Sequence, residues 1–107
     1  MNKRLELHEV LCDILGNRNV YYQPPETVKM KYPAIVYSRS SIDNNHGDNL
    51  PYIQNYAYMV TLIDKNPDSE FVDKLAKIPT CRFIRNYQVD NLNHDVFLLY
   101  FKGGHFK

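Results

Sequence analysis

Apolar residues near the start of the chain recur at the spacing of an α-helix. Leu7, Leu11 and Ile14 follow one another at intervals of four and three residues, which places them on one side of a helix. We therefore predict an amphipathic helix over residues 3–15. Gly16 follows directly and is suited to the left-handed conformation that often ends a helix.

A second helix is predicted after the polar stretch in the middle of the chain. Its apolar stripe consists of Phe71, Leu75 and Ile78. Asn66 can cap the first turn and Pro67 fits the first helical position, so we expect the helix to begin there. Pro79 cannot continue a helix and is expected to end it.

Five further segments have the composition of β-strands. They are residues 20–22, 34–40, 52–64, 81–89 and 95–102. Towards the end of residues 52–64, the odd-numbered and the even-numbered positions are both apolar. Because these positions point to opposite faces of a sheet, we expect that end to be covered on both faces. The nearly continuous apolar run 95–102 is typical of a central strand. The turn-rich residues 90–94 are expected to connect it to the strand before.

The order of these elements predicts an α+β fold. We expect a mainly antiparallel sheet of four to five strands with two helices packed on one face. Residues 1–102 are expected to form a single domain and residues 103–107 a flexible C-terminal tail. Residues 41–51 (SIDNNHGDNLP) are predicted to form a polar loop, longer than the about two to five residues usual in a hairpin. Such long loops are often functional.

Composition narrows the class of protein. The chain has 107 residues, of which 44% are hydrophobic, and a formal net charge of +1. These values are typical of one globular domain and lack the basic excess usual in duplex-binding proteins. We find no apolar run long enough to span a membrane and no secretory signal pattern. Cys12 and Cys81 are therefore expected to be reduced thiols, and the protein to be made in the cytoplasm.

Motifs for catalysis or metal binding are missing from the sequence. Asp43, His46 and Asp48 occur close together, but their spacing lacks the ligand ladder of a calcium loop, and a solvated turn is expected. The two cysteines do not fall in settings that would activate a thiol. We therefore expect no enzymatic activity, no cofactor and no metal site.

Basic residues beside aromatic ones leave a nucleic-acid alternative open. Arg82 and Arg85 flank two apolar residues, and Tyr56 and Tyr58 share one face of the longest predicted strand. A sheet with stacking side chains and basic edges can bind single-stranded nucleic acid. Acidic and basic residues are interleaved along the chain, however, which favours core or subunit-interface roles for the tyrosines.

Three segments resemble a family of phage proteins. They are residues 31–37 (KYPAIVY), 58–69 (YMVTLIDKNPDS) and 90–97 (DNLNHDVF). Together they resemble the small tail-completion proteins of long-tailed bacteriophages, also called tail terminators, head–tail joining proteins or minor structural proteins. The resemblance extends from about Leu7 to Tyr100.

The resemblance implies an assembly role in the virion tail-neck region. Proteins of this family form a ring, expected to be a hexamer, that caps the tail tube, stops its growth and offers a joining surface to the head connector. The partners implied are other copies of the chain, the tail tube protein and the neck protein, with DNA present only as the passing genome and no membrane involved. Another neck or head-completion adaptor is the alternative assembly role.

Two sets of residues are candidates for these contacts. The polar loop is expected to contact the tube or connector through Asp43, Asn44, Asn45, His46, Asp48 and Asn49. A subunit interface or the lumen of the ring is expected to contain Arg82, Arg85, Tyr56 and Tyr58.

Overall fold

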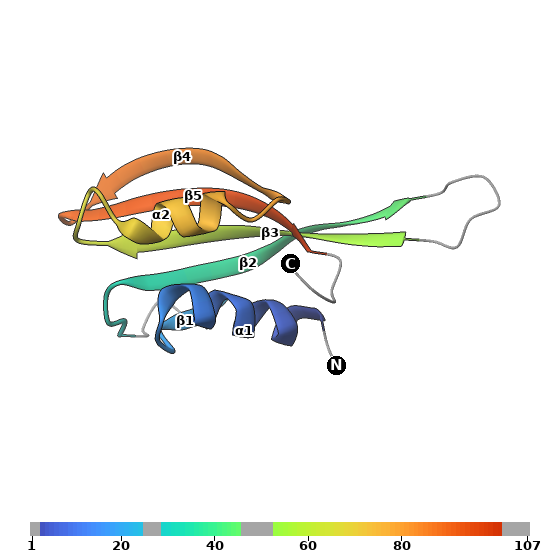
Figure 1. Cartoon of the computed structure of the whole chain (residues 1–107), viewed down its shortest axis with the longest axis horizontal. Helices are drawn as coiled ribbons and strands as arrows, with labels where there is room; N and C mark the ends of the chain where they lie inside the picture. The colour runs from blue at the N-terminus through green and yellow to red at the C-terminus, as the bar shows by residue number, and fades with distance from the viewer. Residues whose placement is uncertain (1–2, 25–28, 46–52, 102–107) are drawn as a thin grey trace.

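The computed structural model describes residues 3–24, 29–45 and 53–101. Its elements occur in the order α1 (Lys3–Leu15), β1 (Val20–Tyr22), β2 (Ala34–Asn45), β3 (Ile53–Asp64), α2 (Glu70–Ala76), β4 (Cys81–Val89) and β5 (Leu92–Phe101) (Figure 1). The strands form one five-stranded sheet in the order β1-β2-β3-β5-β4. β1 runs parallel to β2, and the other neighbouring strands are antiparallel. The α+β class with a mainly antiparallel sheet is confirmed, whereas the packing of both helices on one face stays a prediction.

The first helix has the predicted bounds, but the second is shorter than expected. After α1, Gly16 adopts a φ of +80° and its N–H donates to the Cys12 carbonyl at 2.8 Å, which ends the helix as predicted. α2 begins at Glu70, and its N-cap is Ser69, whose side chain accepts from the Phe71 N–H at 3.4 Å. The prediction of Asn66 as the cap is wrong because its side chain accepts from the Asp68 N–H and forms a turn ahead of the helix.

Two polar segments predicted as connections belong to strands. Residues 41–45 extend β2 and pair with residues 53–57 of β3, so the predicted loop 41–51 is wrong over this part. Its remainder lies outside the described residues, as does the predicted tail 103–107. β5 begins at Leu92, and the turn before it is formed by Asp90 and Asn91, which both have positive φ. Cross-strand pairing, which composition does not reveal, keeps these polar residues extended.

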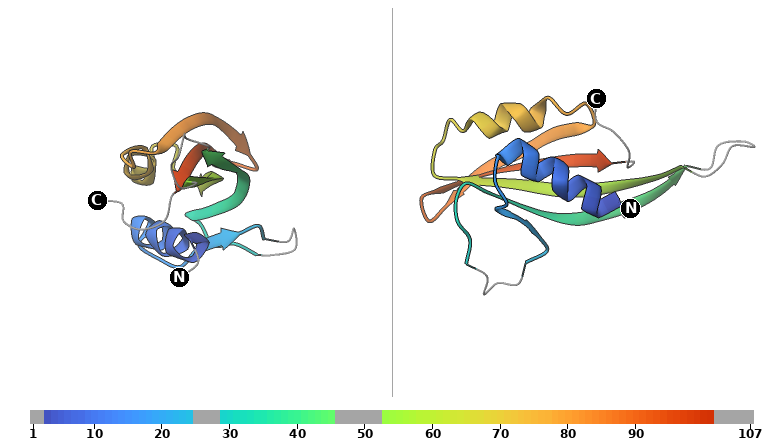
Figure 2. Two further views of the ribbon diagram at one scale, coloured as in Figure 1. Left: turned by 90° about the vertical axis from the view of Figure 1, so that its right-hand side faces the viewer. Right: turned by 60° about the horizontal axis from the view of Figure 1, so that its bottom comes forward.

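One core cluster joins both helices to the sheet. It contains Leu7, Leu11, Cys12 and Leu15 of α1, Leu75 of α2, Ile78, and side chains from β1, β2, β3 and β5. Leu62 and Ile63 are both buried, which confirms that the end of β3 is covered on both faces. Figure 2 shows the strongly twisted sheet, with α1 lying beside β1 and α2 near β4. Because β4 lies at the edge farthest from β1, most of its surface is left outside this core.

Candidate assembly surface on an exposed edge strand

β4 forms one edge of the sheet and has no buried side chain. Eight of its nine residues are exposed and Cys81 is partly buried. Four of the exposed residues are large and apolar or aromatic: Phe83 at 49%, Ile84 at 41%, Tyr87 at 39% and Val89 at 48% relative exposure. Single exposed apolar residues are common on protein surfaces, but several on one edge strand indicate an interaction surface.

The outer edge of β4 is open to another strand. In the described sheet, β4 pairs on one side with β5 and has no strand on the other. Its backbone N–H and C=O groups on that side are therefore a template for strand addition. Lys and Pro, which often block such edges, do not occur in β4, although a register shift between Phe83 and Arg85 interrupts the ladder. The edge of β4 is therefore open to a partner strand on either side of this register shift.

Basic and aromatic side chains meet on one face of β4. Tyr87 lies opposite His94 of β5, and their rings stack with centroids 4.7 Å apart and planes 14° apart. The guanidinium carbon of Arg85 lies 5.5 Å from the centroid of the Tyr87 ring, at the distance of a cation–π contact. Arg82 is also exposed on this strand. The predicted pair Arg82 and Arg85 therefore lies on an accessible strand that can meet a partner.

The predicted tyrosine pair lies elsewhere. Tyr58 is 1% exposed, and its ring centroid lies 6.0 Å from that of Tyr37 in an edge-to-face contact. It is a core residue, so its proposed place at a subunit interface is corrected. Tyr56 is partly buried and packs against the same core cluster. The shared parity of Tyr58 with Val60 and Leu62, both fully buried, is the sequence signal that favours the core.

Only some of the predicted contact residues of the polar loop lie within the described residues. Asp43, Asn44 and Asn45 lie in β2, opposite Asn55, Gln54 and Ile53 of β3. His46, Asp48 and Asn49 lie outside the described residues. Figure 1 shows β2 and β3 running together well beyond the other strands, as a two-stranded extension of the sheet. We call residues 41–45 and 53–55 the hairpin arm.

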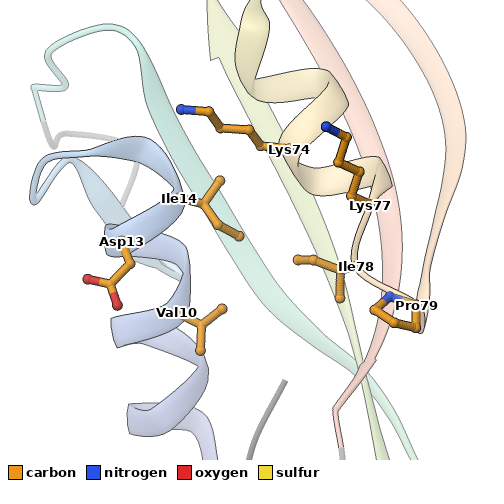
Figure 3. Close-up of a pocket in the computed structure, with 7 residues that line it drawn as sticks. All are labelled: Val10, Asp13, Ile14, Lys74, Lys77, Ile78 and Pro79. Carbon is orange, nitrogen blue, oxygen red and sulfur yellow. The ribbon is translucent and has the colours of Figure 1, made fainter. Parts of the chain in front are cut away.

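A groove separates the two helices on another side of the molecule. It has a volume of about 440 Å³ and is lined by Val10, Asp13, Ile14, Lys74, Lys77, Ile78 and Pro79. Figure 3 shows Ile14 and Ile78 pointing towards each other across it, with both lysines on the α2 side. The Lys74 ammonium lies 5.2 Å from the centroid of the Phe71 ring. The groove can accept an apolar side chain, but it has no arrangement of groups for catalysis.

Reactive and metal-ligating side chains do not form a centre in the described part of the chain. Burial raises the pKa of Cys81 to about 11, and burial also raises the pKa of Cys12. Both residues are therefore protonated thiols near neutral pH and poor nucleophiles. Residues 3–24, 29–45 and 53–101 contain no cluster of three or more His, Cys, Asp or Glu placed to bind a metal. No helix within these residues could cross a membrane.

The apolar residues of β4 are the functional candidates that the sequence analysis missed. Phe83, Ile84 and Val89 read as ordinary strand residues, because their exposure depends on the place of β4 in the sheet. Comparison of the chain with models of protein families and with curated proteins gives no match. The candidate surface is therefore defined by geometry: a free strand edge with exposed apolar, aromatic and basic side chains.

Proposed function

We propose that this protein is a virion assembly subunit of a long-tailed bacteriophage. Copies of the chain form a ring that caps the tail tube, ends tail elongation and provides the surface where head and tail join. The observation that supports this most is the exposed edge strand β4, whose four large apolar or aromatic residues are solvated in a single copy. The sequence resemblance of residues 31–37, 58–69 and 90–97 supplies the biological setting.

Strand addition along β4 suits a closed ring. A ring uses heterologous contacts, in which one surface of each subunit meets a different surface of the next. The apolar and aromatic side chains of β4 would lose contact with water on assembly, and burial of such area is the main driving force of association. In this proposal the polar residues between β2 and β3 contact the tail tube or the connector, as their sequence suggests.

The ring is tested first with the purified chain. Light scattering after gel filtration, over a range of concentrations, is expected to show a defined oligomer. The double variant Ile84→Ser with Val89→Ser is expected to be monomeric, because it removes exposed apolar contacts without touching the core. Leu5→Ser is the matched control, since Leu5 on α1 is 46% exposed and lies away from β4. A wild-type monomer at every concentration would contradict self-assembly.

The biological role is tested in the parent phage. Electron microscopy of a lysate that lacks this gene is expected to show full heads beside separate or overlong tails. Heads lacking a closed neck but tails of normal length would indicate the alternative role of a neck or head-completion adaptor. Intact virions would refute both assembly roles.

One observation favours a second candidate function. The stacked rings of Tyr87 and His94, with Arg85 beside them, resemble in chemistry the platforms that bind single-stranded nucleic acid. β4 also contains two arginines and no carboxylate. A single-stranded nucleic-acid-binding module would bind oligonucleotides with an affinity that falls as salt rises, and this affinity should be lost in Tyr87→Ala. A ring that binds no oligonucleotide would remove this candidate.

A further inference from the structure

The hairpin arm has an unpaired edge. β1 pairs with β2 over Ile35–Tyr37, and beyond Arg39 the outer edge of β2 has no strand beside it in the described structure. β5 pairs with β3 only as far as Tyr56. Among the described residues, 41–45 and 53–55 thus form a two-stranded ribbon in which each strand pairs only with the other.

Such a ribbon is marginally stable by itself. A ribbon of two strands gains independent stability in water only from a third strand or from packing against another element. The shift in register between Arg39 and Ser41 marks a bulge at the base of the arm, which separates its ladder from that of the main sheet. A further strand that paired with the arm beyond this bulge would supply the contacts that the arm needs for stability.

The arm and β4 have complementary charge. β4 contains Arg82 and Arg85 and no acidic residue. Residues 41–45 and 53–55 contain Asp43 and no basic residue. The opposite formal charges of the two segments would favour this pairing and disfavour arm–arm or β4–β4 pairing, in which like charges meet.

The arm cannot reach β4 of its own chain. In the sheet order, β3 and β5 lie between β2 and β4, so the free edge of β2 and the free edge of β4 face away from each other. A contact between the two edges therefore needs a second molecule. It is also heterologous, because the arm of one copy meets β4 of the next.

We propose that residues 41–45 of one copy add as a strand to the outer edge of β4 in the neighbouring copy. This proposal rests on the ring described above and assigns the two surfaces that close it. Backbone hydrogen bonds supply the pairing, the exposed side chains of β4 are covered, and the negatively charged segment 41–45 joins a strand that contains Arg82 and Arg85. Residues 41–45 are fewer than the nine residues of β4, so length alone does not fix the register, which is set by the charges and the bulge.

Charge reversal on each side tests the contact. Asp43→Arg, and separately Arg82→Asp with Arg85→Asp, are expected to raise the dissociation constant of the oligomer about tenfold or more, because like charges then face each other. The three changes combined in one chain are expected to restore the oligomer, since every interface again pairs opposite charges. Lys74→Asp, in the groove between α1 and α2, is the control and should leave the oligomer unchanged.

Amide hydrogen exchange of the full chain supplies a second readout. In the wild-type oligomer the amides of β4 and of residues 41–45 are expected to exchange more slowly than in the Asp43→Arg variant at the same concentration. The proposal is overturned if Asp43→Arg assembles as well as wild type, or if the combined chain regains nothing. Wild-type rings with an unaffected Asp43→Arg variant would refute this contact alone, whereas a monomeric wild type would refute the ring itself.

Discussion

The Nδ1 atom of His8 on α1 lies 2.8 Å from the hydroxyl oxygen of Tyr37 on β2. Arg4 donates to the same hydroxyl at 3.4 Å, so the Tyr37 oxygen lies between a guanidinium and the imidazole of His8. The Tyr37 ring is 1% exposed and also contacts the ring of Tyr22. His8 is thus partly buried against this core ring, and this burial favours the uncharged imidazole.

Stability is expected to depend on the protonation of His8. Burial, followed by the nearby charges of Arg18 and Arg4, lowers the pKa of His8 below its ordinary value. As pH falls, the unfolded chain binds this proton first, so the stabilising contribution is complete above the unfolded pKa and is lost as pH decreases towards the folded pKa. We expect the melting temperature to fall between about pH 7.5 and 5.5.

A paired variant isolates this effect. In His8→Gln the change in melting temperature over the same pH interval should be smaller than in wild type, because the titrating group is gone. Leu5→Ala, at an exposed and non-titrating position on the same helix, serves as the comparison, and its pH dependence should resemble that of wild type. Equal slopes in wild type and His8→Gln would refute the assignment to His8.

Phe97 is expected to be a major contributor to stability. Its side chain is fully buried, and its ring contacts that of Phe83 in an edge-to-face arrangement with centroids 5.5 Å apart. Phe97→Ala should lower the free energy of unfolding by about 3–5 kcal/mol, since it leaves a cavity in the core. Urea denaturation measures this change, and Leu5→Ala at an exposed site should cost about 0.5 kcal/mol or less. A similar loss in both variants would contradict the core assignment.

The turn between β4 and β5 requires residues that tolerate a left-handed backbone. Asp90 has a φ of 53° and Asn91 a φ of 64°, the signs expected of a type I′ turn. Asn91→Val should reduce the free energy of unfolding by about 1–2 kcal/mol, because a β-branched residue is strained there. Asn91→Gly should be tolerated, and Leu5→Ala at an exposed site on α1 should change little. Chemical denaturation of the three variants checks this, and an unstrained Asn91→Val would disprove it.

Cys81 is expected to react slowly with alkylating reagents despite its partial exposure. A pKa of about 11, against an ordinary value of 9.0, reduces the thiolate population near pH 8 roughly a hundredfold. Iodoacetamide labelling followed by mass spectrometry should therefore show slow modification of the folded chain and fast modification in guanidinium chloride. Rapid labelling of Cys81 in the folded protein would show that burial does not suppress its thiolate.

The sequence alone determined the elements whose signals depend only on neighbouring residues. Leu7, Leu11 and Gly16 define α1 and its end, because helical periodicity and a left-handed stop depend only on nearby residues. The alternating and apolar runs identified all five strands, and so the α+β class. Arg82 and Arg85 were also found as candidates from their charge and their place beside apolar residues.

Tertiary structure decided which of these surfaces meet solvent. Tyr58 and Tyr87 are both aromatic residues in predicted strands, yet one lies in the core and the other on an edge, because β3 is central in the sheet and β4 is not. Residues 41–45 have the composition of a loop. They form part of a strand because residues 53–57, which lie outside their local sequence, pair with them. Strand order and register depend on contacts between distant segments, and for that reason the free edge of β4 and the arm appear only in the folded chain.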